Sequence, residues 1–435
     1  MHVNAHLDVD VVALENDDIV TVMLDLEAPV GDTDATRPDY AAVVVLDRSG
    51  SMSGAPLAAA KRGLLDLVDR LDERDSFGLV VFDDRAQVAV PAATIKTLGR
   101  DRIRQAILDV RPGGSTDMSS GYLRGLQEAR RVVPPGGATI VLLSDGHANA
   151  GIVDPAKFRD MGAKAASQAI TTSTIGIGVG YDDQILSELA IGGTGNHSFA
   201  EEADAASAAI AGELDGLMSK TVQAASLTIT PGDAVETITV LNDLPSQALP
   251  GGVLVELGDL YSGEQRRLLF SITIPAMAGL GLATVAELIL EFVSIPELIS
   301  HTVTLPVSVN VVPQDVAQGR VPDPEVRRQA MLLEVQSAKR QSERAMRSGD
   351  VESARVSLSA ARDALSTLGP RAGAEVADEL ADIARTLDML DDELPSAIRL
   401  TSAGRTKRSR GYSGRLQGGE VLPTENVPDE DEESS

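Results

Sequence analysis

Residues 41–51 read AAVVVLDRSGS, and this stretch decides the fold that we expect. Its first six residues are all apolar, and the seventh, Asp47, is acidic. An apolar run without alternation is typical of a strand that is buried on both faces of a sheet. The residues after Asp47 include two serines and a glycine, which favours a loop between this strand and a following helix.

Strand and helix patterns alternate from here to about residue 222. A second apolar run that ends in an acid lies at 138–145, and a further strand is expected at 171–180. The stretch 86–92 alternates apolar with polar residues and indicates an antiparallel edge strand. Helical spacing occurs at 55–71, 100–110, 119–133, 154–169, 182–193 and 204–222. This order predicts a doubly wound, Rossmann-like sheet with helices on both faces.

The segments on either side of this α/β region have strand patterns. Residues 3–14 and 18–29 alternate apolar with polar residues, and 222–312 consists of short β-rich segments separated by Gly or Pro. Because an isolated two-stranded ribbon is marginal in water, we expect the N-terminal strands to complete an antiparallel β-sandwich with the later ones. The α/β domain would then be an insertion in this sandwich.

The C-terminal part has helical spacing and then loses its core-forming residues. Residues 324–394 predict a small helical bundle, with a turn at Ser348-Gly349-Asp350. The remainder is charged and poor in apolar residues, which is typical of a disordered tail. The predicted divisions are β strands over 1–36, the α/β domain over 37–222, the β-sandwich over 223–315, the helical bundle over 324–398 and the disordered charged tail over 399–435.

The composition excludes several classes of protein. A net charge of −27 argues against nucleic-acid binding, because phosphates would be repelled. The chain has no cysteine, which excludes disulfides, zinc–thiolate sites and thiol nucleophiles. We see no signal peptide and no run near the roughly 18 apolar residues of a membrane helix. We therefore expect a soluble cytoplasmic protein without a membrane span.

Three polar motifs should meet at the carboxyl edge of the predicted sheet. They are 47–51, the glycine-rich stretch 113–117 and Ser144-Asp145-Gly146. Ligands of doubly wound sheets bind at this edge. The oxygen-bearing side chains without histidine or thiol suit Mg²⁺, Mn²⁺ or Ca²⁺ rather than zinc. The alternative interpretation of 47–51 is a helix-capping turn, because Ser and Asp favour such positions.

In this order and spacing, DRSGSM, GGSTD and SDG resemble the metal-ion-dependent adhesion site (MIDAS) of von Willebrand factor A (vWA) domains. The resemblance covers roughly residues 40–220. It implies that Ser49, Ser51 and Thr116 offer hydroxyls to the metal, and that Asp47 and Asp145 bind it directly or through water. It further implies a non-enzymatic adaptor or scaffold, since the family generally binds a Glu or Asp carboxylate of a protein partner at an open metal position.

The wider arrangement resembles bacterial vWA proteins and the heavy chains of inter-alpha-trypsin inhibitors. A second hypothesis is a vWA subunit of an AAA+ ATPase assembly of the MoxR or chelatase type; the sequence has no P-loop, so the ATPase would be a separate chain. A metal-dependent hydrolase with Asp47 as nucleophile is less favoured, because no lysine and second acid pair lie nearby. The acidic stretch 429–433 is either a solubilising tail or an occupant of the metal site.

Overall fold

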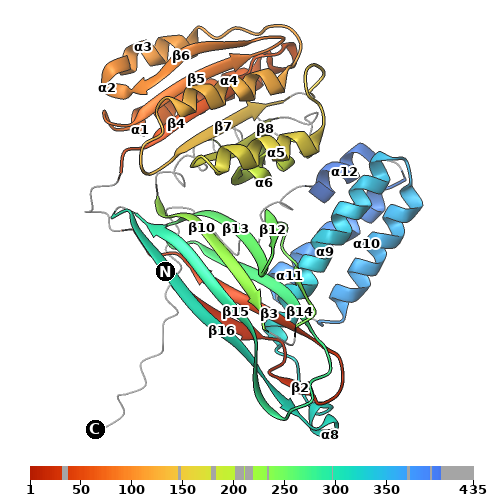
Figure 1. Cartoon of the computed structure of the whole chain (residues 1–435). Coiled ribbons are helices and arrows are strands. Elements are labelled where there is room, and N and C mark those ends of the chain that lie inside the picture. The colour runs from red at the N-terminus through yellow and green to blue at the C-terminus, as the bar shows by residue number, and fades with distance from the viewer. Residues whose placement is uncertain are drawn as a thin grey trace, which may run out of the picture.

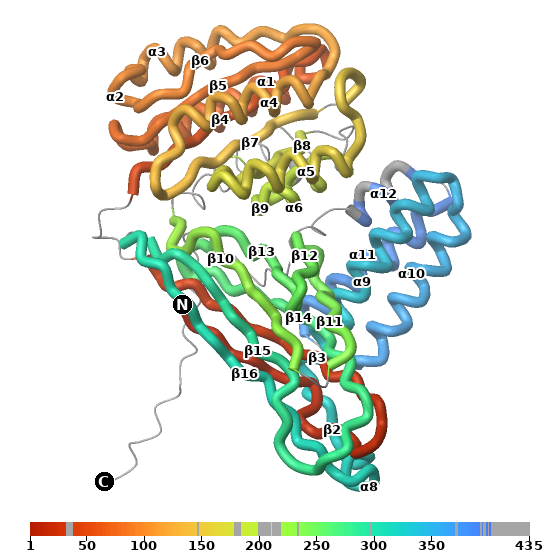
Figure 2. Tube along the Cα trace, in the orientation of Figure 1, coloured from red at the N-terminus to blue at the C-terminus, as the bar shows by residue number. Residues whose placement is uncertain are grey.

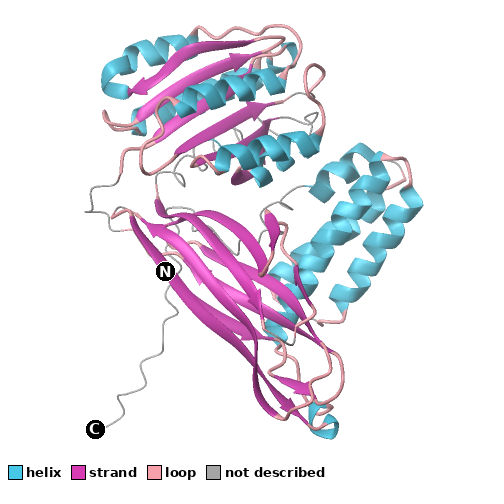
Figure 3. Ribbon diagram, in the orientation of Figure 1, coloured by secondary structure: helices cyan, strands magenta, loops and turns pink. Residues whose placement is uncertain are grey.

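The computed structural model describes residues 1–31, 38–145, 148–177, 183–200, 210, 219–232, 235–295, 297–369, 373–391 and 394–402. They form an α/β domain, two packed β-sheets and a group of long helices (Figure 1). Figure 3 shows strands layered with helices in the first part, whereas the other two are almost wholly strand or wholly helix. None of the described helices is long and apolar enough to cross a membrane.

The α/β domain is built on a six-stranded sheet in the order β6-β5-β4-β7-β8-β9. Every residue of β4, β5, β7 and β8 is buried, as expected for strands covered on both faces. β6 pairs antiparallel with β5 at the edge, and the other strands run parallel, so the predicted α/β sheet is confirmed. The strands are β4 (Ala41–Asp47), β5 (Ser76–Phe82), β6 (Ala86–Thr94), β7 (Ala138–Ser144), β8 (Ile170–Ile177) and β9 (Thr194–Ala200).

Helices cover both faces of this sheet. On one face, Leu64 and Ile103 share a core with Leu46 of β4. On the other face, Tyr122 and Phe158 share a core with β4 and its neighbours. The helices are η1 (Gly50–Met52), α1 (Ala55–Arg70), α2 (Ile95–Leu98), α3 (Arg100–Leu108), α4 (Met118–Arg130), α5 (Pro155–Ala166) and α6 (Asp183–Gly192).

The helix that we predicted at 204–222 falls mostly outside the described residues. Ile210 is described, and it is helical and buried. The prediction is wrong at its end, because residues 220–222 begin strand β10 (Lys220–Pro231). Val222 of this strand is fully buried in the core of the β-sheets. Its apolar side chain therefore packs in that core and not on the face of a helix.

The N-terminal prediction of one strand over 3–14 is also wrong. The segment divides into β1 (His2–Leu7) and β2 (Val11–Ala13), which join different sheets. The division occurs at Asp8, whose Oδ1 accepts hydrogen bonds from the backbone N–H groups of Val9 (2.7 Å) and Thr21 (2.8 Å). Because the Asp8 side chain takes the place of a backbone carbonyl as acceptor for these N–H groups, the regular hydrogen-bond ladder between β1 and β3 ends there.

Two sheets pack face to face around one hydrophobic core. β3 (Asp18–Glu27) lies between β1 and β14 in the four-stranded sheet, and β2 pairs with β16 at the edge of the six-stranded sheet. β12, a short exposed strand, was not predicted. The later strands are β11 (Thr237–Val240), β12 (Ser246–Leu249), β13 (Gly252–Tyr261), β14 (Gln265–Ile274), β15 (Gly281–Ser294) and β16 (Ile299–Val312).

The C-terminal helices form a separate group beside the sheets (Figure 1). At the predicted turn, Asp350 caps α10 by accepting a hydrogen bond from the Ser353 N–H, and Gly349 has a φ of 80°. α12 was not predicted as a helix and runs four residues past the expected boundary at 398, while 403–435 lie outside the described residues. The helices are α8 (Gln314–Ala317), α9 (Pro324–Arg347), α10 (Val351–Ser366), α11 (Ala374–Met389) and α12 (Leu394–Ser402).

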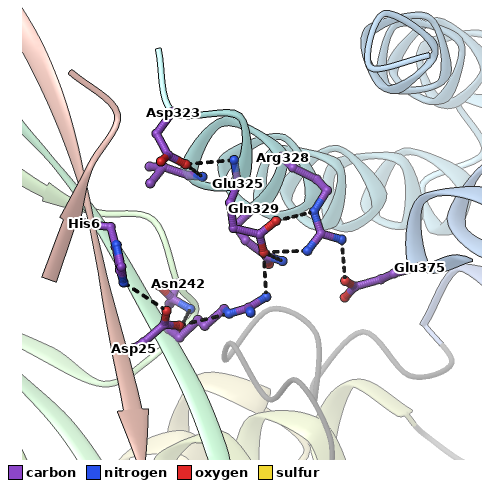
Figure 4. A network of polar contacts seen from close by, with 10 residues as sticks. His6, Asp25, Asn242, Asp323, Glu325, Arg328, Gln329 and Glu375 are labelled. Carbon is purple, nitrogen blue, oxygen red and sulfur yellow. Dashed lines mark hydrogen bonds and ion pairs between the residues drawn. The ribbon is translucent and has the colours of Figure 1, made fainter. Parts of the chain in front are cut away.

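An ion-pair network joins the helices to the four-stranded sheet (Figure 4). The guanidinium of Arg267 on β14 lies 3.0 Å from a carboxylate oxygen of Asp25 on β3 and 3.0 Å from one of Glu325 on α9. Arg328 binds Glu325 and also lies 3.4 Å from Glu375 on α11. Two sheet strands and two helices therefore share one continuous set of charge-assisted contacts.

A buried ion pair lies between the α/β domain and the six-stranded sheet. Figure 2 shows β10 and β13 of that sheet next to the α/β domain. Lys220 Nζ lies 2.6 Å from Asp259 Oδ2, and the two side chains are 7% and 8% exposed. Thr171 of β8 donates its hydroxyl to the same carboxylate (2.9 Å), and Lys220 donates to the Gly136 carbonyl (3.2 Å). The pair thus links the sheet strands to the α/β domain.

We expect acid to remove the contribution of this pair to stability. Burial alone would raise the pKa of Asp259, but the Lys220 ammonium and the hydrogen bonds lower it overall. Its contribution is therefore full above the unfolded-state pKa of about 4 and is lost as the pH falls through the lower folded-state pKa. Urea unfolding of the wild type and Asp259→Asn should show a stability difference that shrinks from pH 7 towards pH 3. A difference independent of pH would contradict this.

Candidate metal centre

The predicted motifs meet at one edge of the α/β sheet. β4 ends at Asp47, and the neighbouring parallel strand β7 ends at Ser144, directly before Asp145. The chain places β5 on one side of β4 and β7 on the other, so the strand order changes direction beside β4. Such a switch point, at the carboxyl ends of the strands, is where doubly wound sheets bind ligands.

Asp47 and Ser49 form the buried part of the site. They are 0% and 2% exposed. The Ser49 N–H donates to Asp47 Oδ1 (2.7 Å), and the Ser144 hydroxyl donates to Asp47 Oδ2 (2.6 Å). Burial raises the pKa of Asp47 in spite of these donors, and the Asp83 carboxylate adds to the rise. A cation beside Asp47 would offset the cost of keeping this carboxylate charged.

Ser51 and Asp145 form the part that faces solvent. The Ser51 hydroxyl lies 3.1 Å from the Ser49 hydroxyl and donates to Asp145 Oδ1 (3.0 Å). Ser51 is exposed and Asp145 is partly buried. Desolvation, together with repulsion from Asp47, raises the pKa of Asp145 to about 6. Two carboxylates and two hydroxyls therefore form one connected group that opens to solvent at Ser51.

Thr116 reaches this region in the glycine-rich loop. The Gly113 N–H donates to the Arg48 carbonyl (2.6 Å), which fixes the loop against the first motif. Thr116 is 3% exposed, and its N–H donates to Asn149 Oδ1 (3.0 Å). Within the described part of the chain, no hydrogen bond joins the Thr116 hydroxyl to the other four candidate residues. The structure thus joins Asp47, Ser49, Ser51 and Asp145 by hydrogen bonds and holds Thr116 beside them through the loop backbone.

Sequence reasoning named Ser144 within its motif but gave no role to it, to Asn149 or to Asp83. The guanidinium of Arg48 lies 3.0 Å from Asp83 Oδ2. Asp83 directly follows β5, a strand that ends at the same sheet edge. That position was visible in the sequence, whereas the contact of Asn149 with Thr116 depends on how two loops fold.

Asp117 caps the start of helix α4. Its Oδ1 accepts hydrogen bonds from the Ser120 N–H (3.0 Å) and the Ser119 hydroxyl (2.7 Å) at the start of α4. The Asp117 carboxylate therefore accepts hydrogen bonds from the first turn of α4. Gly146 and His147, which follow Asp145, lie outside the described residues.

Replacement of Gly113 by alanine should destabilise the loop. A Cβ at this position would lie 2.0 Å from Asp83 Oδ2, so Asp83 or the loop must move. We expect a loss of about 1–3 kcal/mol in the free energy of unfolding, the usual cost of overpacking, measured by urea denaturation. Gly114→Ala is the matched control, because its nearest neighbour, an Asp84 oxygen, would lie at 3.7 Å. Equal effects of the two variants would contradict this explanation.

The donor set fits a hard divalent cation. All five candidate side chains offer oxygen, and Mg²⁺, Mn²⁺ and Ca²⁺ prefer oxygen ligands. The carboxylates of Asp47 and Asp145 repel each other because they are close together and partly removed from water, and a bound divalent cation would relieve this repulsion. Across the described ranges, no group of three or more His, Asp or Glu side chains is placed to hold a metal. Hydroxyls must therefore supply part of any cation site here.

Comparison with known proteins agrees with the fold. Residues 42–212 match the family model of the von Willebrand factor type A domain. An uncharacterized Synechocystis protein, sll0103, is 32% identical over 158 residues, which cover 36% of this chain and 37% of that protein. Rat inter-alpha-trypsin inhibitor heavy chain H3 is 30% identical over 178 residues, 37% of this chain and 19% of that one. The chain thus spans well under half the length of these relatives.

A solved structure resembles the chain over most of its length. It is a von Willebrand factor type A protein from Catenulispora acidiphila, with a TM-score of 0.68, 16% identity and coverage of 95% of this chain and 97% of that one. At this identity the likeness concerns the fold alone. Together with the family match and the strand order, it shows that this chain contains a von Willebrand factor type A domain.

Proposed function

We propose that this chain binds a divalent cation, Mg²⁺, Mn²⁺ or Ca²⁺, and through it a carboxylate of a protein partner. The ligands in this proposal are Asp47, Ser49, Ser51, Thr116 and Asp145. The observation that carries it is the hydrogen-bonded group from Asp47 through both serines to Asp145 at the switch point of the sheet. A bound cation would supply an electrophilic position that an Asp or Glu side chain of the partner can fill.

The burial of the candidate ligands indicates the side from which a partner approaches. Asp47, Ser49 and Thr116 are buried, whereas Ser51 is exposed and Asp145 is half-buried. A partner carboxylate would therefore reach the cation from the Ser51 side. Such an exchange of oxygen ligands needs no general base, and this favours recognition over turnover of a substrate.

We also propose that the α/β domain is an insertion in a β-sandwich. The support is that β3, which precedes the domain, pairs with β14, which follows it, and that β2 likewise pairs with β16. Both sheets contribute to one hydrophobic core. In this setting the domain boundary falls close to residue 219, and the cation site is one recognition point on a larger scaffold.

Partner capture tests this function. We would immobilise the full chain, identify bound proteins from the native organism, and repeat the binding with the purified partner. Binding should occur with Mg²⁺ and be lost with EDTA, in Asp145→Ala, and when the contacting acid of the partner is changed to its amide. Asp84→Asn is the control, since Asp84 lies near the glycine loop but its side chain is 59% exposed. Binding that survives both EDTA and Asp145→Ala would refute the proposal.

A further inference from the structure

A cavity of about 280 Å³ lies between the α/β domain and the six-stranded sheet. Thr171 and Thr194, which line it, stand at the amino ends of β8 and β9. It therefore lies at the opposite edge of the α/β sheet from Asp47 and Asp145. Its volume is near the lower end of the range for small-molecule sites. The other wall is formed by residues of β10, β12 and β13.

One wall of this cavity carries a buried acceptor without a donor. Gln223 of β10 lines the cavity and is 8% exposed. Its side-chain Oε1 is buried and has no hydrogen-bond partner among the residues that the structure describes. Buried polar atoms are almost always paired, and an unpaired one has a substantial desolvation cost. If the Gln223 side chain turned toward the cavity, a donor group bound there would satisfy this oxygen.

The acidic side chains of the cavity differ in their pairing. Asp259 is neutralised by Lys220 and also accepts the Thr171 hydroxyl. Glu256 of β13 lines the same cavity, and within the described ranges it has no ion pair. Glu256 is exposed at the cavity, and partial desolvation by the surrounding atoms raises its pKa. The cavity is thus lined by one carboxylate without an ion pair and by a glutamine whose buried oxygen has no donor.

The remaining lining combines aliphatic side chains with the neutral polar side chains of Ser167, Ser246 and Gln247. Ala163 and Ala166 of α5 and Leu254 of β13 contribute apolar surface beside these polar groups. A ligand that suits both surfaces has a short apolar body and a cationic end rich in donors. Because an anion would meet the Glu256 carboxylate and the Gln223 oxygen, it would be repelled. We propose that this cavity is a second binding site, for small organic cations that carry a primary ammonium group on a short aliphatic chain.

A single introduced thiol tests the proposal, because the chain has no cysteine of its own. In Ala166→Cys, the rate of modification by neutral methyl methanethiosulfonate would be measured by mass spectrometry. The probe is n-butylammonium, compared with butyrate and 1-butanol at equal ionic strength. A ligand of five heavy atoms reaches roughly millimolar affinity, so about 50 mM n-butylammonium should slow the reaction at least fivefold.

Two further variants separate binding from general effects. Val356→Cys places the thiol on α10, at a residue that is 60% exposed, and n-butylammonium should leave its reaction rate unchanged. Glu256→Gln in the Ala166→Cys background should reduce the protection, since it removes the uncompensated charge. Equal protection by butyrate, no protection by n-butylammonium, or protection unaffected by Glu256→Gln would each overturn the proposal.

Discussion

Replacement of Lys220 by methionine should lower the free energy of unfolding by about 3–5 kcal/mol, the cost of leaving one partner of a buried ion pair without the other. Lys220 and Asp259 are both buried where β10 and β13 meet the α/β domain. After the substitution, Asp259 would keep donors from Thr171 and the Ala224 N–H but would have no counter-charge. Urea unfolding followed by circular dichroism measures the effect.

Two comparisons identify the cause of this loss. The double variant Lys220→Met with Asp259→Leu should recover most of the stability, because apolar residues often replace a buried pair without cost. Arg74→Met removes a surface pair with Asp39, whose side chains are 38% and 56% exposed, and should change stability by less than about 1 kcal/mol. A double variant less stable than Lys220→Met would contradict the ion-pair explanation.

Asp47→Ala should abolish stabilisation of the chain by divalent cations. A ligand that binds only the folded state at a hundred times its dissociation constant stabilises that state by about 2.7 kcal/mol. We therefore expect Mg²⁺ to raise the unfolding temperature of the wild type but not that of Asp47→Ala, as measured by calorimetry with EDTA as the reference. Asp47 is central because it is fully buried and accepts bonds from both Ser49 and Ser144.

The control for this experiment is Asp84→Asn, which removes an exposed charge close to the same loop. Its Mg²⁺-dependent rise should match that of the wild type. If Asp84→Asn and Asp47→Ala lost the rise equally, nonspecific screening of the negative charge of the chain would explain the stabilisation, and the site would not be required.

The sequence predicted the α/β sheet well because its strands are buried on both faces. An uninterrupted apolar run such as 41–46 has few other structural explanations, and an acid at its end marks the edge where ligands bind. The same reasoning brought Asp47, Ser49, Ser51 and Asp145 together, and the structure joins these four by hydrogen bonds. Motif spacing along parallel strands therefore carried most of the information about the site.

The features that sequence reasoning missed depend on tertiary contacts. The end of β1 at Asp8 requires the Thr21 N–H, which only the paired strand provides. The pairing of Arg48 with Asp83 requires the ends of two adjacent strands to be known together. Residues 220–222 are Lys, Thr and Val, which do not separate helix from strand, and Val222 is buried in the core that the two β-sheets share.

A titration with Mn²⁺, followed by electron paramagnetic resonance of the free ion, tests the central claim most directly. The wild type and Asp84→Asn should each bind one ion per chain with the same affinity, and Mg²⁺ should compete. Asp47→Ala and Asp145→Ala should show no binding at that site. If the wild type binds no Mn²⁺, or if both of these variants bind it as the wild type does, the proposed metal centre does not exist.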